Sequence, residues 1–200
     1  MARLLSDRAR NTDQVVLLPS SLEDPNISPP GLYRVGLLIT CISISAFFIS
    51  LVIAYYWRKH TPPFWDPVPI PKTLRLSTVL ILISSGTFET ARRLFRRGSW
   101  RLASQFLLVT ASLGTAFLAS QLTAWRSLVQ HGAFLAKNPH SSFFFLFTGL
   151  HAAHLVGGLV VLFVVVLGKS KRRELVDVAT FYWHFLGVLW LWLYWILVTA

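Results

Sequence analysis

The stretch FFFLFTGLHAAHLVGGLVVLFVVVLG, residues 143–168, holds two histidines inside an otherwise apolar run. Its length matches the roughly 20 apolar residues that a helix needs to cross the ~30 Å hydrocarbon core of a bilayer. A neutral imidazole in hydrocarbon needs a partner, which a metal, a haem or another side chain could provide. The fold of the chain and the role of His151 and His154 are therefore linked questions.

The rest of the chain has the same character. Of its 200 residues 54 % are apolar and 14 % are charged, and the mean hydropathy is +0.57. We expect an all-α, polytopic membrane protein, with a polar N-terminal tail at residues 1–34 and a transmembrane domain at 35–200. Five prolines between the first two apolar runs exclude a helix there. The five predicted transmembrane helices span residues 35–57, 74–95, 102–125, 142–167 and 176–199.

The basic residues predict the orientation of these helices. The tail and the loops after the second and fourth helices carry thirteen Lys and Arg, and the other two loops carry six. The positive-inside rule then places the N-terminus in the cytoplasm and Ala200 outside. The net charge is +11, but the basic residues flank the predicted membrane spans. We therefore expect no nucleic-acid partner. Cys41 is the only cysteine, which excludes an internal disulfide and zinc or redox sites of the CxxC type.

Four ionisable residues fall inside the apolar part of the predicted helices: Glu89, His151, His154 and His184. Since such residues are costly to bury, each is a candidate functional residue. His151 and His154, at i and i+3, share a helix face, and His184 is predicted near the depth of His154. A haem held between His154 and His184 is therefore one interpretation.

The favoured interpretation is an interior in which polar side chains satisfy one another. Thr148, the histidines and Tyr182 could form hydrogen bonds across a helix pair. Small residues would let the backbones approach closely, and these are Gly149, Ala152, Ala153, Gly157 and Gly158. A zinc site would need a carboxylate or thiolate that the last two helices lack at this depth.

Glu89 is followed by Arg92 and Arg93, at i+3 and i+4, so ion pairing is a simpler expectation than a proton relay. The polar cluster just before Glu89 predicts tight helix packing; its residues are Ser84, Ser85, Gly86 and Thr87.

Four segments resemble subunit III of the haem-copper terminal oxidases, in its short five-helix bacterial form. They are SSFFFLFTGLHAAHLVGGLVVL (141–162), YWHFLGVLWLWLYWIL (182–197), LSTVLILISSGTFETARR (76–93) and LGTAFLASQLTAW (113–125). The corresponding structural motif residues are Ser84, Ser85, Thr87, Glu89, Gln121, Thr148, Gly149, His151, His154, Gly157, Gly158, Tyr182, Trp183, His184 and Phe185.

The resemblance implies an accessory subunit without catalytic, cofactor-binding or metal-binding residues of its own. Haem and copper would belong to partner subunits, with subunit I as the main contact and subunit II as the second. The chain would stabilise subunit I during O₂ reduction coupled to proton pumping, in the bacterial cytoplasmic membrane. It would also retain phospholipid, in a cleft between its first two and last three helices.

Two family carboxylates are missing from this chain, because Ile44 and Gly187 stand at their positions. Two alternatives stay open: a haem b electron carrier that uses His154 and His184, and the related subunit of a nitric oxide reductase. The electron donor, cytochrome c or quinol, is also left open.

Overall fold

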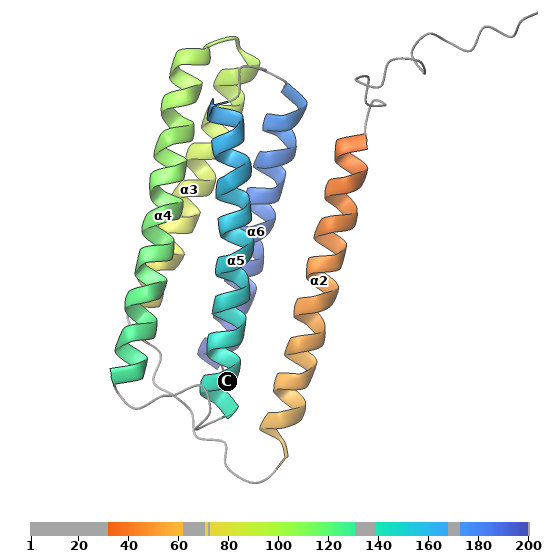
Figure 1. The fold of residues 1–200 in the computed structure, drawn as a ribbon, viewed down its shortest axis with the longest axis vertical. Coiled ribbons are helices and arrows are strands. Elements are labelled where there is room, and N and C mark those ends of the chain that lie inside the picture. Colours follow the sequence, from red (N-terminus) through yellow and green to blue (C-terminus); the bar gives the residue numbers. More distant parts are fainter. Residues whose placement is uncertain (1–31, 62–70, 72, 131–138, 168–172, 200) are drawn as a thin grey trace, which may run out of the picture. The chain divides into compact units, whose positions relative to one another are not determined.

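The computed structural model describes residues 32–61, 71, 73–130, 139–167 and 173–199. It is all-helical in these residues, as predicted (Figure 1). The helices are α2 (Leu32–Lys59), α3 (Thr73–Arg96), α4 (Trp100–Gln130), α5 (Pro139–Leu167) and α6 (Arg173–Thr199). Each contains the range predicted for it, and the largest difference is at the end of α4, which continues past Trp125. Most of the predicted tail and of the proline-rich loop lies outside the described residues.

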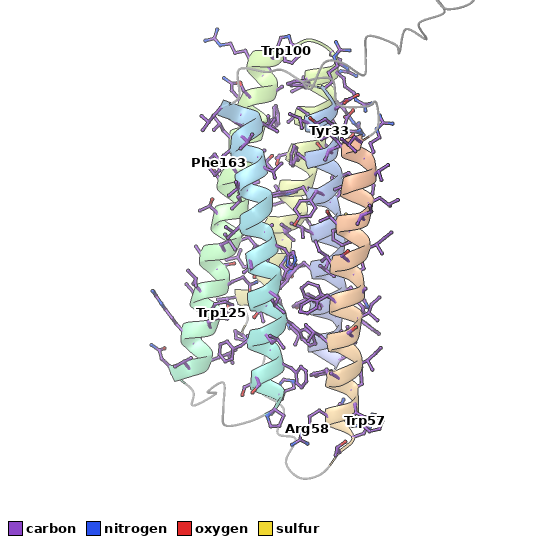
Figure 2. The ribbon with its side chains drawn as sticks, turned by 45° about the vertical axis from the view of Figure 1, so that its right-hand side comes forward. Tyr33, Trp57, Arg58, Trp100, Trp125 and Phe163 are labelled. Carbon is purple, nitrogen blue, oxygen red and sulfur yellow. The ribbon has the colours of Figure 1, made fainter. Side chains whose placement is uncertain are left out.

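Helices α3 to α6 form a four-helix bundle. Helix α3 packs against α4 and α6, and α5 packs against the same two helices, so the ring of contacts is closed. Tyr33 and Trp100 lie at one end of the helices, and Trp57 and Arg58 lie at the other (Figure 2). The first of these ends, where α3 is connected to α4, is called the arginine end below because Arg92, Arg93 and Arg96 lie in the last turns of α3.

The bundle has the spacing of a coiled coil. The buried residues of α3 follow one another in steps of three and four; they are Leu74, Ser77, Ile81, Ser84, Phe88, Ala91 and Phe95. Helix α4 buries a matching series that includes Ala103, Leu107, Thr110, Gly114, Phe117, Gln121, Ala124 and Leu128. Such steps keep one stripe of each helix turned toward its neighbour along the whole length of the pair.

A tight turn joins the two helices of this pair. Gly98 has a φ of +82°, a backbone conformation that residues with a Cβ rarely adopt. The Gly98 amide donates to the Phe95 carbonyl at 3.2 Å, and the Ser99 amide donates to the Leu94 carbonyl at 3.0 Å. These two bonds form a Schellman cap, which ends α3 and allows α4 to return antiparallel after a few residues.

Helix α3 is the least apolar of the five. Helices α2, α4, α5 and α6 are long and apolar enough to cross a membrane, whereas α3 does not reach that threshold among the described residues. The prediction of five spans is thus supported by composition for four helices. Two hydroxyls of α3 face the bundle, where Ser77 accepts from Gln121 at 3.0 Å and Thr78 accepts from Trp190 at 3.1 Å.

Helix α2 contacts the bundle through large side chains. Phe48 and Tyr55 are fully buried, and the Tyr55 ring lies 5.4 Å from the Phe143 ring of α5, between centroids. No Cα atom of α2 lies within 8 Å of a Cα atom in the other described helices. The predicted grouping of the first two helices against the last three is therefore wrong, because α3 belongs with α4 and α6.

Candidate functional site

The histidines of the HxxH motif point to different neighbours. His151 is completely buried, with its ring centroid 5.1 Å from that of Trp190 on α6 and 5.8 Å from that of Phe117 on α4. His154 faces α2, where its ring centroid lies 5.8 Å from that of Phe48. Residues three apart on a helix differ by about 60° in direction, and this is enough to separate the bundle core from the α2 contact.

The predicted hydrogen-bond network around these histidines is mostly wrong. Neither ring nitrogen of His151 has a hydrogen-bond partner in the described part of the chain. The Thr148 hydroxyl donates to the Phe144 carbonyl at 2.7 Å and accepts from the Trp125 indole at 3.0 Å. His154 Nδ1 lies 2.7 Å from the Leu150 carbonyl of its own helix. The Tyr182 hydroxyl does reach His154, but it donates to the backbone carbonyl at 3.4 Å and not to the imidazole.

Glu89 lies in an ion-pair network at the arginine end. Both of its oxygens accept from Arg92, at 2.8 and 2.9 Å, and Oε1 also accepts from Arg93 at 2.8 Å. This confirms the predicted pairing. His184 of α6 completes the surroundings, with Nε2 3.8 Å from Glu89 Oε2.

Asp177 is a member of this network that the sequence analysis missed. Its carboxylate accepts from Arg96 Nη2 at 2.9 Å and lies 3.6 Å from Arg92 Nη1. Asp177 therefore ties the start of α6 to the end of α3. The available signal was an acidic residue near the start of a predicted membrane helix, within reach of a basic loop that the topology brings to the same side.

The haem interpretation requires His154 and His184 to converge on one space. The structure instead places His154 against Phe48 of α2 and His184 beside Glu89 of α3. Within the described ranges, no three His, Cys, Asp or Glu residues gather in a way that could hold a metal ion. In the described residues, His154 and His184 thus lie against different helices.

Trp183, from the YWHF motif, is the central contact of the bundle. Its indole donates to Ser84 Oγ at 2.7 Å, and its ring lies over two glycines. A Cβ on Gly114 would lie 2.8 Å from the ring, and one on Gly158 would lie 3.4 Å from it. Gly114 was missed in the sequence analysis. Close to Ser84, the hydroxyls of Thr87 and Thr110 join α3 to α4 at 2.9 Å.

The other predicted small residues have a different role. A Cβ on Gly157 would meet nothing within 4 Å, and one on Gly149 would make only ordinary contacts with Trp125. Gly158 is thus packed closely by the side chains of Trp183 and Leu186 rather than by a neighbouring backbone, and Gly157 has no close neighbour. Phe185, also from the YWHF motif, stacks on Tyr182 with ring centroids 6.5 Å apart.

The two positions of the missing carboxylates are filled by close packing. Ile44, on α2, is buried in the hydrophobic core of the protein. At Gly187 a Cβ would lie 3.2 Å from Ser85 Oγ, so any larger side chain would require Ser85 to move. At Gly187 a side chain would therefore require only a small shift of the Ser85 hydroxyl.

Two hollows lie between α2 and α6. The larger, with a volume of about 380 Å³, is at the arginine end and is lined by residues that include Arg34, Arg92, Arg96, Glu89, Asp177 and His184. The smaller, about 200 Å³, is further along the same two helices and is lined by Ser45, Ile49, Phe185, Val188, Leu189 and Trp192. The first combines charged and apolar walls, and the second is almost entirely apolar.

Comparisons with known proteins identify the family of the chain. The family model described as Cytochrome c oxidase subunit III matches residues 28–199. A probable cytochrome c oxidase subunit 3 of Nocardia farcinica is 27 % identical over 180 residues, which cover 84 % of this chain and 88 % of the relative. The cytochrome c oxidase subunit 3 of Corynebacterium diphtheriae is 26 % identical, with the same shares covered. That of Synechocystis is 27 % identical over 81 % of this chain and 73 % of its own length. The chain is a multi-pass membrane protein that belongs to the cytochrome c oxidase subunit III family.

Proposed function

We propose that this chain is the five-helix accessory subunit III of a bacterial aerobic haem-copper oxidase. It would bind subunit I, its main contact, and subunit II. It would stabilise the catalytic subunit and retain lipid during O₂ reduction coupled to proton pumping. The observation that carries the proposal is the family match over residues 28–199. The relatives' names, cytochrome c oxidase subunit 3, support an oxidase partner over a nitric oxide reductase.

The polar residues form hydrogen bonds and ion pairs within the chain, which supports a structural role for this subunit. The buried Trp183 of α6 donates a hydrogen bond to Ser84 of α3, and the buried Gln121 of α4 also donates to α3. Glu89 forms ion pairs with two arginines. These hydrogen bonds join α4 and α6 to α3, and such a bundle would support a neighbouring subunit. Its apolar outer faces, such as Val160 and Val164 on α5, suit lipid or another membrane subunit.

The position of the chain in the membrane is part of the proposal. All five helices would cross the bacterial cytoplasmic membrane, with the arginine end in the cytoplasm and Ala200 outside. The excess of Lys and Arg in the connections on that side supports this orientation. Helix α3 would cross because α4 and α6 cover its polar face, although its own composition is less apolar.

Purification in mild detergent tests the function directly. An affinity tag on this chain should recover a haem-copper catalytic subunit, and the isolated chain should show no haem in a pyridine haemochrome spectrum. Deleting the gene should leave the initial rate of O₂ reduction largely intact and shorten the working lifetime of the enzyme. Recovery of haem b with the isolated chain would support the electron-carrier alternative and contradict the proposal.

A further inference from the structure

Helix α2 lies further from the bundle than packed helices normally do. The axes of packed helices are ~8–10 Å apart, and the nearest Cα atoms of such a pair are closer still. No Cα atom of α2 comes within 8 Å of a Cα atom in the other described helices. Side chains bridge this gap, so the attachment of α2 depends on where the large side chains lie along it.

Aromatic rings bridge the gap in the second half of α2, where they meet α5. Tyr55 packs on Phe143 and Phe147, with ring centroids 5.4 and 5.7 Å away. Phe48 packs on His154, with ring centroids 5.8 Å apart. Residues 34–46 contain no aromatic side chain. This mode of attachment is therefore confined to the end of α2 that lies away from the arginine end.

Two hollows separate α2 from α6. The larger is lined by Leu37 and Leu38 of α2 and by Val178 and Phe181 of α6. The smaller lies between the same two helices, further along them. Helix α2 is therefore attached to α5 on one side and faces open space on the side of α6.

The charges at the arginine end favour a closer approach of α2 to α6. Arg34 of α2 lines the larger hollow together with Asp177 of α6, and no ion pair of Arg34 occurs within the described ranges. The Asp177 carboxylate accepts from Arg96 at 2.9 and 3.3 Å, and 24 % of its side chain is exposed. Because a carboxylate has about four acceptor positions, Asp177 can also accept from a second guanidinium.

We infer that α2 is a hinged arm. It pivots on the rings of Phe48 and Tyr55 against α5, and it closes toward α6 through an ion pair between Arg34 and Asp177. From Tyr55 to Arg34 the helix rises ~31 Å, at 1.5 Å per residue, so a tilt of about 10° moves Arg34 by ~5 Å. Closure narrows the larger hollow and covers Glu89, which lines it. This movement belongs to the chain itself and does not depend on which catalytic subunit accompanies it.

Distances between spin labels test the hinge. In a Cys41→Ser background, one label pair is attached at the arginine end through Val35→Cys and Glu174→Cys. A second pair is attached at the opposite end through Ile53→Cys and Val198→Cys. All four of these positions are exposed. Pulsed EPR of the full chain in lipid nanodiscs should give a short and a long distance for the first pair and one narrow distance for the second. One narrow distance for each pair would overturn the inference.

Arg34→Gln tests the ion pair that closes the arm. It should lower the ratio of the short to the long distance by up to about fivefold, the scale of a partly exposed ion pair. Arg34→Lys should restore part of this ratio. Arg97→Gln is the matched control, because Arg97 is exposed at the same end but does not line the hollow. Equal ratios in Arg34→Gln and Arg97→Gln would show that this ion pair does not close the arm.

Tyr55→Ala tests the pivot. Because it removes the ring packed on Phe143 and Phe147, it should broaden the narrow distance of the second label pair. Tyr56→Ala, which removes the exposed ring beside it, is the control and should leave that distance narrow. An unchanged distance in Tyr55→Ala would overturn the assignment of the pivot to these rings.

Discussion

The indole nitrogen of Trp183 on α6 donates a 2.7 Å hydrogen bond to the hydroxyl of Ser84 on α3, across 99 positions of sequence. Both side chains are fully buried. The same ring lies against Gly114 of α4 and Gly158 of α5. One side chain thus contacts all three other helices of the bundle, which makes its surroundings the most informative place to test the structure.

A double-mutant cycle measures this contact. Trp183→Phe removes the donor, and Ser84→Ala removes the acceptor. Because the pair is buried, we expect a coupling free energy of about 0.5–1.5 kcal/mol, the range for a neutral hydrogen bond. Denaturant unfolding of the purified chain in detergent gives the four stabilities needed. Strictly additive effects of the two substitutions would show that the bond does not contribute.

Adding one methyl group at Gly114 should destabilise the bundle. The new Cβ would lie 2.8 Å from the Trp183 ring, and the indole cannot retreat without stretching its bond to Ser84. Overpacking of this kind typically costs about 1–3 kcal/mol. Gly157→Ala is the control, because that position is open and alanine favours helix by up to ~1 kcal/mol. Equal thermal stability of the two variants would contradict the packing described here.

Replacing His151 by Leu should leave stability unchanged or raise it. The imidazole is buried among Phe117 and Trp190 without a hydrogen-bond partner in the described residues, and removing an unsatisfied polar group can be neutral or favourable. His154→Ala, by contrast, removes a ring packed on Phe48 and should cost about 1–3 kcal/mol. Thermal unfolding in detergent compares the two. A large loss for His151→Leu would mean that its ring nitrogens have an essential partner.

The haem content of the complex should be the same in both histidine variants. Loss of one haem per catalytic subunit in either of them would show that these residues hold a redox centre.

Glu89→Gln should change assembly more than turnover. Glu89 is paired with Arg92 and Arg93. The substitution therefore weakens the ion-pair network at the arginine end, which contributes up to ~1 kcal/mol to stability. O₂ reduction measured against pH should keep the wild-type profile. A marked drop in turnover at alkaline pH, with the complex still assembled, would instead assign Glu89 to proton uptake. Arg97→Gln, which changes an exposed charge at the same end, is the control for electrostatic effects.

Labelling of single cysteines tests the orientation. In a Cys41→Ser background, a cysteine at Thr61 should react with a membrane-impermeant thiol reagent in intact cells, and a cysteine at Arg97 should be protected. Both positions are exposed at opposite ends of the described helices. Permeabilised cells should label both, which controls for reactivity. The opposite pattern in intact cells would reverse the proposed topology.

The sequence predicted the helices well because length and apolar content decide them locally. It did not predict which face of each helix meets which neighbour. Gly157 and Gly158 are adjacent and identical residues, but only Gly158 faces α6. Similarly, the spacing of His151 and His154 suggested one shared environment, whereas a rotation of ~60° puts them in two.

The polar contacts of α3 could not be predicted from the sequence, for a related reason. Their donors come from α4 and α6, at separations of 44 residues for Gln121 to Ser77 and 112 residues for Trp190 to Thr78. Hydrophobic periodicity carries no information about partners at such distances. Asp177 was missed in the same way, because its pairing with Arg96 depends on α6 lying beside α3.

The hydroxyls of α3 also bear on the order in which the protein is made. Ser77 and Thr78 donate to carbonyls of their own helix, at 3.1 and 2.9 Å, so they do not depend on a later helix to satisfy their protons. The hairpin of α3 and α4, closed at Gly98, therefore needs no side chain of α6 to satisfy these two hydroxyl protons. The indoles of Trp183 and Trp190 then arrive last and find acceptors already in position. Synthesis of the chain thus ends with the helix whose indoles join the others, and we expect a chain truncated before α6 to be loosely packed.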